Sequence, residues 1–390
     1  MEGIKLDEIG PELVLHVYDP PTGMRGVVVI DTTVYGSAAG GIRMLPDITT
    51  SEIVDLARVM TYKFAIFNLP VGGAKGGIWA EPHIRNRDEI LIAYGRAIAP
   101  LLRSGIYIPG ADMGTSDKDV QLICDAAGAE EVKPRGLGLK IKEGMPLEDH
   151  LTGYGVVTAC KIACEFAGID LNGATVAIEG FGKVGGGVAR YMARAGAKVV
   201  AISTIKGAIY NPNGIDVEEL LEMRKRYGDD VVLAYKDAKR LEKEELFSLP
   251  VDILVPGARP YVINRSNVDK IGAKIVCPGA NIPVTDEAEE ILLRRGIISV
   301  PDFIANGGGI IAGVVDRLGG DEKQAFSMIE SLIGSLTRRV LSEAMDKGIP
   351  PRTIAVEIAR QRVLEAMRKR ERKSLEELRK AVKESLGVRD

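Results

Sequence analysis

The chain has 390 residues, 46% of them hydrophobic, and a formal net charge of −3. This length allows two domains with separate cores, and this composition is typical of a packed globular protein and excludes a disordered one. The near-neutral charge and the dispersed basic residues argue against a nucleic-acid partner, and no apolar run is long enough to span a membrane.

The cysteines indicate a reducing environment. Cys124, Cys160, Cys164 and Cys277 form no CxxC pair and have no histidines at zinc spacing, and the four-residue spacing of Cys160 and Cys164 is expected to place both in a helix core. The N-terminus has no secretory signal pattern. These features predict a cytoplasmic protein without a metal site.

The first part of the chain mixes strands, helices and glycine-rich loops. The patterns predict, in order, a strand at 12–18, a turn at 19–23, a strand at 25–31, a close-approach loop at 36–43, a helix at 47–62 with Lys63 at its end, a glycine-rich loop at 69–78, a helix at 89–102, a strand at 106–108 leading to Asp112, and a helix at 117–127.

Lys75 is the charged centre of the glycine-rich loop, in Gly72-Gly-Ala-Lys-Gly-Gly77. Glycines let a backbone approach a ligand closely. A lysine shielded from water has a lowered pKa and can exchange protons. The alternative is an ordinary turn with a solvated lysine, but the neighbouring Lys63 and Asp112 favour a site with a carboxylate anchor and a proton-transfer pair.

Residues 128–150, rich in glycine and charge, are predicted to connect two domains. The chain then alternates helices and strands. The predicted elements are a helix from Thr152 to Ala167, a strand at 172–179, a helix to Ala195, strands at 198–203, 251–255, 274–276 and 297–300, and helices at 322–346 and 351–385. The basic run at 368–373 indicates a solvated helix face.

The segment Gly180-Phe-Gly-Lys-Val-Gly185 lies at the strand-to-helix turn of a predicted βαβ unit. In this motif the first glycine permits the tight turn, the second lets a pyrophosphate approach, and the third lets helix and strand pack. The helix N-terminus faces the phosphates. The framing by two strands favours dinucleotide binding over a mere tight turn.

Several motifs, in order over nearly the whole chain, resemble the glutamate/leucine/phenylalanine/valine dehydrogenase superfamily, with a likeness to glutamate dehydrogenase. They are Gly40-Gly-Ile-Arg43, Thr61-Tyr-Lys63, Gly72-Gly-Ala-Lys-Gly-Gly77, Ala111-Asp-Met-Gly-Thr115, Thr152-Gly-Tyr-Gly155, the GxGxxG segment, Gly279-Ala-Asn281 and Asn306-Gly-Gly-Gly309.

The resemblance implies an α/β protein of two domains. Residues 1–150, completed by C-terminal helices at 335–390, would form a substrate-binding and oligomerisation domain, and residues 151–334 a Rossmann-type NAD(P)-binding domain. The implied cleft lies between the domains and closes on substrate. The implied assembly is a homo-oligomer, with a hexamer favoured.

The implied reaction is the reversible oxidative deamination of an L-amino acid to a 2-oxo acid and ammonia, with hydride passed to NAD(P). By resemblance, Lys63 holds the substrate α-carboxylate, Lys75 activates the water that attacks the imino carbon, and Asp112 exchanges protons with the substrate nitrogen. A non-catalytic nucleotide-binding regulatory protein is the remote alternative, and the presence of all three residues argues against it.

The substrate pocket departs from the glutamate-specific pattern. Ala39, before Gly40, stands where those members have a lysine for the γ-carboxylate, and Gly313 stands where they have a serine. The wall positions Gly110 and Ile310 are apolar as well. A carboxylate buried there without a partner would cost on the order of several kcal/mol. We therefore expect an apolar side chain, with glutamate dehydrogenase proper as the alternative.

The cofactor site implied by the resemblance consists of Thr152, Gly180, Phe181, Gly182, Lys183, Val184, Gly185, Thr204, Lys206, Asn281 and Asn306. An acid at the end of the second Rossmann strand would hold the ribose hydroxyls. None is present at residues 203–206, and Lys183 and Lys206 are nearby cations for a 2′-phosphate. This favours NADP, but NAD stays open because Lys206 at a solvated turn would fit equally well.

Overall fold

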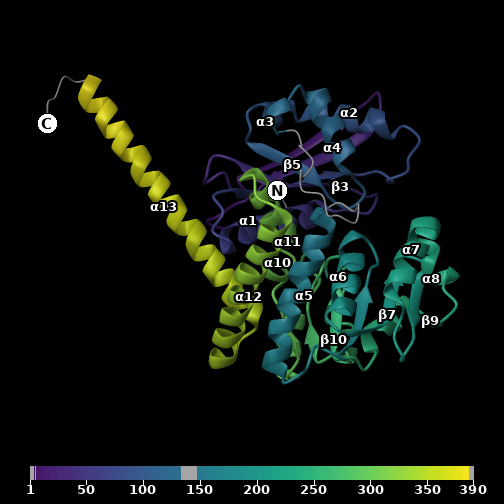
Figure 1. Cartoon of the computed structure of the whole chain (residues 1–390). Coiled ribbons are helices and arrows are strands. Elements are labelled where there is room, and N and C mark those ends of the chain that lie inside the picture. Colours follow the sequence, from purple (N-terminus) through teal and green to yellow (C-terminus); the bar gives the residue numbers. More distant parts are fainter. Residues whose placement is uncertain (1–3, 5, 133–146, 386–390) are drawn as a thin grey trace. The chain divides into compact units, whose positions relative to one another are not determined.

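The computed structural model describes residues 4, 6–132 and 147–385 (Figure 1). The chain divides into two compact units, Met1–Gly136 together with Glu357–Asp390, and Leu137–Val356. These bounds differ from the predicted domains because residues 335–356 group with the second unit. There α12 (Glu322–Lys347) packs along α5 (Leu147–Ala167). Of the predicted connection at 128–150, residues 133–146 lie outside the described residues.

The first unit is built on a five-stranded sheet. Its strands are β1 (Leu13–Asp19), β2 (Met24–Ile30), β3 (Ala38–Met44), β4 (Gly72–Ile78) and β5 (Tyr107–Ala111). They lie in the order β1-β2-β4-β3-β5. The first three in this order pair antiparallel, whereas β3 runs parallel to both β4 and β5. The predicted hairpin at 12–31 is confirmed as β1 and β2.

Helices cover both faces of this sheet. They are α1 (Thr50–Ile66), α2 (Arg87–Ala97), α3 (Ala99–Arg103), α4 (Asp117–Ala127) and the short 3-10 helix η1 (Glu130–Val132). Figure 1 shows α2, α3 and α4 gathered on one side of β3 and β5. The core on that side contains Ile42, Tyr94, Tyr107 and Ile123, all fully buried. The helix α1 lies against the opposite face of β4, as its contacts with Gly73 show.

The predicted loops at 36–43 and 69–78 are wrong, because their central parts form the strands β3 and β4. The glycines serve close packing and not loop flexibility. A Cβ on Gly73 would lie 2.3 Å from the carbonyl oxygen of Ala57 in α1, and one on Gly76 would lie 2.7 Å from the Tyr94 hydroxyl. Only glycine lets the strand pass between these two layers.

Two helix predictions need correction. The predicted helix at 47–62 is α1, which runs on to Ile66, so Lys63 lies within its last turn. The predicted helix at 89–102 is interrupted at Ile98, between α2 and α3. Pro100 lies at the start of α3, where its missing N–H is tolerated, whereas inside a continuous helix it would remove a hydrogen bond.

The last helix, α13 (Pro351–Ser385), belongs to the first unit from Glu357 onward. Arg362 donates hydrogen bonds to the carbonyl oxygens of Ala65 and Ile66, at 2.9 and 2.6 Å. These are carbonyls at the C-terminal end of α1, which a cation stabilises. The return of this helix therefore secures the end of the helix that carries Lys63.

The second unit contains a seven-stranded sheet. Its strands are β6 (Thr175–Glu179), β7 (Lys198–Thr204), β8 (Gly207–Tyr210), β9 (Lys239–Leu241), β10 (Ile253–Pro256), β11 (Ile275–Val276) and β12 (Ile298–Ser299). Their order is β12-β11-β10-β6-β7-β8-β9. The first five in this order run parallel, and β8 and β9 extend the sheet antiparallel. This confirms the Rossmann-type expectation.

The helices of the second unit include several that the sequence patterns did not predict. Besides α5 and α12 they are α6 (Lys183–Arg194), α7 (Val217–Tyr227), α8 (Val231–Ala234), α9 (Asp286–Arg294), α10 (Asp302–Ala305), α11 (Gly308–Arg317) and the 3-10 helices η2 (Gly228–Asp230), η3 (Lys243–Ser248) and η4 (Val268–Lys270). Within the described residues no helix has the length and hydropathy needed to cross a bilayer.

The strand order places a switch point at β6, which has β7 on one side and β10 on the other. In doubly wound sheets, ligands bind beyond the carboxyl ends of the strands at such a point. The GxGxxG segment follows β6, and Gly257 follows β10. The topology therefore brings the predicted phosphate-binding loop to the expected edge of the sheet.

Candidate active site

The predicted residues of the first unit gather on the α1 face of its sheet. Side chains alternate between the faces of a strand. Because Ala38, Ile42 and Tyr107 belong to the opposite core, the alternation places their intervening neighbours on the α1 face. These neighbours are Ala39, Gly41 and Arg43 on β3, and Gly110 and Asp112 along the line of β5. On β4, Lys75 lies between Gly73 and Gly77, which both contact the α1 side.

Lys75 and Asp112 form a buried ion pair. The Nζ atom of Lys75 lies 2.9 Å from Oδ2 of Asp112, and the side chains are 3% and 17% exposed. Arg43 contacts the same oxygen through Nε, also at 2.9 Å. The Nη1 atom of Arg43 lies 2.5 Å from Oε1 of Glu52 in the first turn of α1. Two cations and two carboxylates thus form one compact cluster.

The cluster shifts the protonation equilibria of its members. Burial lowers the pKa of the Lys75 ammonium and Arg43 lowers it further, against the opposing effect of Asp112. For Asp112, burial favours the neutral acid, but Lys75 and Arg43 outweigh it and hold the pKa of this carboxyl well below its usual range. A lysine with a weakened hold on its proton therefore lies beside a carboxylate that stays ionised.

The loop after β5 fixes Asp112. Its N–H donates to the Thr115 hydroxyl at 3.0 Å, and that hydroxyl donates to the Ile42 carbonyl on β3 at 2.7 Å. A Cβ on Gly41 would lie 2.8 Å from the Cβ of Asp112. Gly114 has a φ of 79°, in the left-handed region that favours glycine. The Gly-Gly and Asp-Met-Gly-Thr motifs therefore hold Asp112 over β3.

Lys63 lies on α1 and is 5% exposed. A network at the middle of α1 sets the position of this helix on the sheet. The Thr61 hydroxyl donates to Asp31 at 2.5 Å and accepts from the N–H of Gly73 at 3.2 Å. The guanidinium of Arg58 bonds both oxygens of Asp31 at 2.9 Å. The lysine is thus placed by contacts made by its neighbours along the helix.

The positions of the first unit predicted to line the substrate pocket are small or open. Ala39 lies on β3 opposite Gly73, and Gly110 lies opposite Gly41. Among the described residues, no atom lies within 4 Å of the Cβ that Gly110 lacks. Gly40 has a packing role instead, because a Cβ there would lie 1.6 Å from the carbonyl oxygen of Ala74. It permits the close pairing of β3 with β4.

The GxGxxG segment has the geometry of a phosphate-binding turn. Gly180 has a φ of 87°, and a Cβ on Gly185 would lie 1.9 Å from the Gly180 carbonyl oxygen. Around Gly182 nothing lies within 4 Å of the absent Cβ. Gly182 is also the N-cap of α6, and no side chain caps this end of the helix. The open N-terminus fits a pyrophosphate.

Two contacts brace this turn. Glu179, the last residue of β6, accepts hydrogen bonds from the N–H groups of Gly257 and Ala258, at 3.0 and 2.8 Å. The N–H of Gly180 donates to the Ser203 hydroxyl on β7 at 3.1 Å. The loop is therefore tied to the strands on both sides of the switch point, and its shape is fixed in advance of ligand binding.

Asn281 and Asn306 come together at the other end of the expected cofactor site. The Nδ2 of Asn306 donates to Oδ1 of Asn281 at 3.0 Å, while its own Oδ1 is buried and has no hydrogen-bond partner among the described residues. Asp302 accepts from the N–H of Ile282, whose φ is 50°. A buried, unpaired amide oxygen fits a carboxamide donor such as that of nicotinamide.

The remaining predicted cofactor residues differ in their contacts and exposure. The Thr204 hydroxyl donates to the Asp229 carbonyl at 2.7 Å, and Lys206 is exposed, with Nζ 4.0 Å from Asp230. Phe181 is 1% exposed and lies under the guanidinium of Arg224. The other predicted cofactor positions are Thr152 within α5 and Lys183 and Val184 at the start of α6, whereas the predicted substrate positions Ile310 and Gly313 lie on α11.

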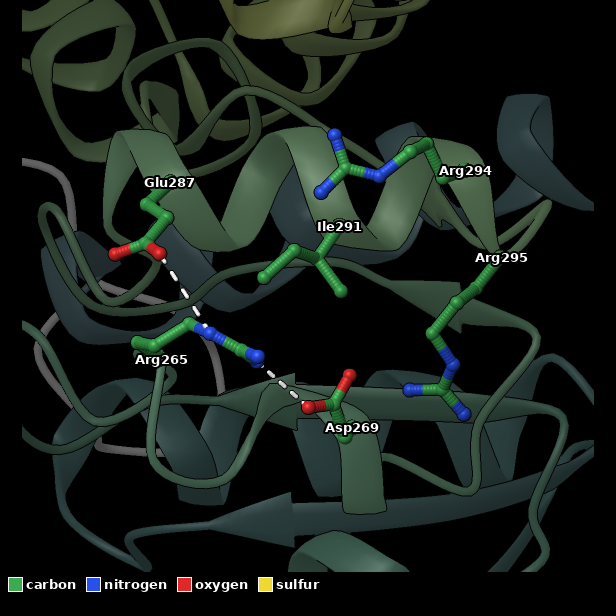
Figure 2. Close-up of a pocket in the computed structure, with 6 residues that line it drawn as sticks. All are labelled: Arg265, Asp269, Glu287, Ile291, Arg294 and Arg295. Atoms are coloured by element: carbon green, nitrogen blue, oxygen red, sulfur yellow. Dashed lines mark hydrogen bonds and ion pairs between the residues drawn. The ribbon is translucent and has the colours of Figure 1, made fainter.

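A separate pocket of about 300 Å³ lies on the second unit, lined by Arg265, Asp269, Glu287, Ile291, Arg294 and Arg295. Figure 2 shows Arg265 between Asp269 and Glu287, with ion-pair distances of 2.6 and 3.6 Å. None of the predicted site residues lines it. Among the described residues, no cluster of histidine, cysteine and acidic side chains could hold a metal ion.

Sequence reasoning missed two members of the charged cluster. Arg43 was noted only as part of a motif, and Glu52 was not singled out. A buried arginine requires a carboxylate partner, so Arg43 within a glycine-rich strand was a usable signal. For Glu52 the only signal was its place three residues after the N-cap Thr49, whose hydroxyl accepts from the Glu52 N–H at 3.1 Å.

A doubly wound sheet with an open GxGxxG turn, in one chain with a buried lysine–aspartate pair, defines a nicotinamide-dependent dehydrogenase. The chain belongs to the Glutamate/Leucine/Phenylalanine/Valine dehydrogenase family, whose model matches residues 144–371. The model of the Glu/Leu/Phe/Val dehydrogenase dimerisation domain matches residues 11–128. The protein is therefore an NAD(P)-dependent amino-acid dehydrogenase that carries out oxidative deamination, and the family prediction is confirmed.

The chain is similar to several glutamate dehydrogenases. It is 38% identical to that of Thermotoga maritima over 86% of this chain and 83% of the relative, and 36% identical to that of Aeropyrum pernix over 86% and 84%. The NADP-specific enzyme of Saccharolobus shibatae is 33% identical (86% and 82% covered). The NAD-specific glutamate dehydrogenase A of Halobacterium salinarum is 32% identical (86% and 79% covered).

Two solved structures illustrate the likeness in fold. The hetero-hexameric glutamate dehydrogenase from Thermus thermophilus, in a leucine-bound form, has a TM-score of 0.79 at 29% identity, over 92% of this chain and 90% of that one. The L-tryptophan dehydrogenase from Nostoc punctiforme has a TM-score of 0.63 at 27% identity, over 93% and 98%. The likeness therefore includes enzymes named for a charged and for an apolar amino acid.

Proposed function

We propose that this enzyme deaminates L-amino acids with an apolar side chain in preference to glutamate. The observation that carries the proposal is the surroundings of the Lys75–Asp112 pair. On the same face of the sheet, Ala39 carries no charge and Gly110 leaves open space, while Arg43 is already engaged by two carboxylates. A substrate carboxylate beyond the reacting carbon finds no spare cation on these strands.

In the proposed reaction three side chains act on the substrate. Lys63 binds the α-carboxylate. Lys75, as the neutral amine, takes a proton from the water that attacks the imino carbon, and Asp112 exchanges protons with the substrate nitrogen. NAD(P), when bound, would supply the hydride acceptor, and the α6 N-terminus and the amide of Asn306 would hold it. The lowered pKa of Lys75 supports its role, because a base works best when its pKa lies near the working pH.

Two further positions predicted by the resemblance, Ile310 and Gly313, lie on α11 of the second unit. Among the described residues, no atom lies within 4 Å of the Cβ that Gly313 lacks, and Ile310 is apolar. Placing a γ-carboxylate among such groups would cost on the order of several kcal/mol. Burial of an aliphatic substrate side chain there is favourable instead, by roughly 1.5–3 kcal/mol for a leucine or valine.

Glutamate dehydrogenase proper is the second candidate. Its support is the identity of 32–38% to enzymes with that name, over 86% of the chain. If it is correct, a cation must reach the pocket from outside the strands described above. Lys140 and Lys142, the candidates for this role, lie outside the described residues. The two candidates are separated by the relative rates with leucine and glutamate.

We infer that NADP is preferred over NAD. Thr204 stands at the end of β7, where an acid would repel a 2′-phosphate, and its hydroxyl is already bonded to Asp229. The ammonium of Lys206 is exposed near this turn. Arg224 adds a further cation: it lies over the ring of Phe181, and its Nε is buried with no hydrogen-bond partner in the described part of the chain. Comparing kcat/KM for the two cofactors tests this inference.

We further propose that the first unit is the substrate-binding and oligomerisation domain, that the second binds the dinucleotide, and that six copies assemble. The match of residues 11–128 to a dimerisation-domain model supports the oligomer, as does β1, an edge strand open to pairing. A cytoplasmic location is supported by four buried cysteines, none of which forms a disulfide within the described residues. Light scattering at micromolar concentration tests the assembly, and a monomer would contradict it.

A further inference from the structure

Arg43 links two carboxylates that lie on different elements. It is 3% exposed on β3, with Nε directed at Asp112 and Nη1 at Glu52 of α1. An arginine has donors on two edges of a rigid plane, so it can hold both acids at fixed angles. A lysine offers a single ammonium and cannot reproduce this arrangement.

Both cations contact the same oxygen of Asp112. Lys75 and Arg43 each lie 2.9 Å from Oδ2. Within the described residues, Oδ1 of Asp112 makes no hydrogen bond or ion pair. The carboxylate is therefore held by one oxygen and presents the other, while its side chain keeps 17% exposure.

We propose that Arg43 and Glu52 are positioning residues: Arg43 fixes Asp112 through Oδ2 so that Oδ1 meets the substrate nitrogen, and Glu52 fixes Arg43 and balances its charge. This inference rests on the proposed role of Asp112. Neither Arg43 nor Glu52 touches the substrate in this account.

The charge balance of the cluster gives the two residues opposite effects. Lys75 and Arg43 carry two positive charges, and Asp112 and Glu52 carry two negative ones. Loss of the Glu52 charge leaves an excess of positive charge beside Lys75, which favours the neutral amine. Loss of the Arg43 charge leaves an excess of negative charge, which favours the ammonium. A purely structural defect would not move the two variants in opposite directions.

Other titratable groups on the elements packed against β4 and β5 form hydrogen bonds or ion pairs outside the cluster, or are present in every variant tested. The hydroxyls of Tyr94 and Tyr107 donate to the carbonyls of Val27 and Gly40, and burial raises the pKa of both. The ion-paired groups are Arg58 with Asp7 and Asp31, and Arg87 with Asp119. Lys63 of α1 is the remaining buried cation and is kept in every variant.

The test compares Glu52→Gln, Arg43→Gln and Arg43→Lys in the full-length enzyme, with kcat, KM and the pH profile of deamination. We expect kcat to fall roughly 10- to 100-fold in each, the loss that a small misplacement of a catalytic group causes, with KM for the amino acid little changed. Activity is expected to rise with pH as Lys75 loses its proton. This rising limb of the pH profile should move to lower pH in Glu52→Gln and to higher pH in Arg43→Gln. Arg43→Lys should lose turnover without moving the limb.

Glu218→Gln is the matched control, since it removes a carboxylate that pairs with another buried arginine, Arg190, in the second unit. It should keep wild-type turnover and profile. The inference would be overturned by a wild-type kcat in Glu52→Gln, or by pH profiles of Glu52→Gln and Arg43→Gln that shift in the same direction. Glu52→Gln is nearly isosteric and keeps the test decisive even if Arg43→Gln fails to fold. Wild-type turnover in Lys75→Met would instead overturn the proposed function itself.

Discussion

The ammonium of Lys75 lies 2.9 Å from Oδ2 of Asp112, on a face of the sheet where glycines flank the lysine on its own strand. The pair joins two of the motifs that carry the family resemblance. Lys75 is almost fully buried, which lowers its pKa, and the negative charges of its own cluster, Asp112 and Glu52, act to raise it. Each group therefore controls the protonation of the other, and removal of either changes the chemistry of the site.

Lys75→Met should abolish most of the turnover. The substitution keeps the length and apolar stem of the side chain but removes the base, so we expect kcat to fall at least ~100-fold, as for loss of a general base, with cofactor affinity retained. Steady-state rates and cofactor titration check this. Lys118→Met, on the exposed start of α4, is the control and should remain active. Unchanged turnover in Lys75→Met would remove this residue from the mechanism.

Lys63→Ala should act mainly on binding. An anchor for the α-carboxylate serves ground state and transition state alike, so its loss raises KM for the amino acid with a smaller change in kcat. The melting temperature of the variant should be measured beside the kinetics, because Lys63 is buried in α1. An unchanged KM in a folded variant would reassign Lys63 to a structural role.

The pH dependence of deamination should report the lowered pKa of Lys75. The proposed base must be neutral, so activity rises with pH as Lys75 loses its proton. Burial lowers this pKa below the ordinary lysine value of 10.5, and the rise should therefore be centred below that pH. The measurement is kcat/KM from neutral to alkaline pH. A rise centred at or above 10.5 would contradict the burial argument.

Glu289 on α9 should make stability depend on pH. It is 4% exposed, and burial raises its pKa from 4.5 to about 7, against the partial attraction of Arg352. The fold therefore favours the neutral acid. This stabilisation is fully present below pH 4.5 and is lost as the pH rises through about 7.

Glu289→Gln should remove that dependence, because the amide stays neutral. Relative to the wild type, the variant should gain stability above pH 7, by an amount of the order of 3 kcal/mol, the free energy that such a pKa difference represents. Thermal unfolding at acidic and alkaline pH measures the effect. Glu290→Gln, the exposed neighbour on the same helix, is the control. Equal melting temperatures for both variants at all pH values would refute this.

The elements with clear periodicity could be predicted from the sequence, and the glycine-rich strands could not. The helices α4 and α12 and the hairpin of β1 and β2 follow their hydrophobic patterns. In β3 and β4, glycines are required where other elements pack closely on the strand. In β4, α1 packs on Gly73 and Tyr94 packs on Gly76. A strand without side chains has no alternation to detect, so only the tertiary structure distinguishes it from a loop.

The candidate site shows the same division. Lys75 and Asp112 could be found because lysine and aspartate among glycines are chemically conspicuous. Glu52 could not be found, because its partner Arg43 is nine residues away on another element. The buried, unpaired oxygen of Asn306 is likewise a product of packing. Sequence motifs identified the reacting groups, whereas the residues that orient those groups required the fold.

Exchange of two pocket residues should redirect specificity. Ala39→Lys combined with Gly313→Ser supplies the charge and hydroxyl that the proposed pocket lacks. We expect kcat/KM for glutamate to rise relative to leucine, because a buried carboxylate then finds partners. Gly313→Ser alone is the control, since a hydroxyl without the cation should change the ratio little. A double variant with the wild-type ratio would show that these positions do not line the pocket.

The most direct test of the account is the specificity of the unmodified enzyme. Initial rates of nicotinamide reduction, measured with NADP and with NAD over a panel of leucine, valine, phenylalanine and glutamate, give kcat/KM for each pair. The account predicts higher values for the apolar amino acids than for glutamate, with differences among them limited to those of single methylenes, about 1–3 kcal/mol. A clear preference for glutamate would contradict it and would require a cation that reaches the pocket from outside β3 and β5.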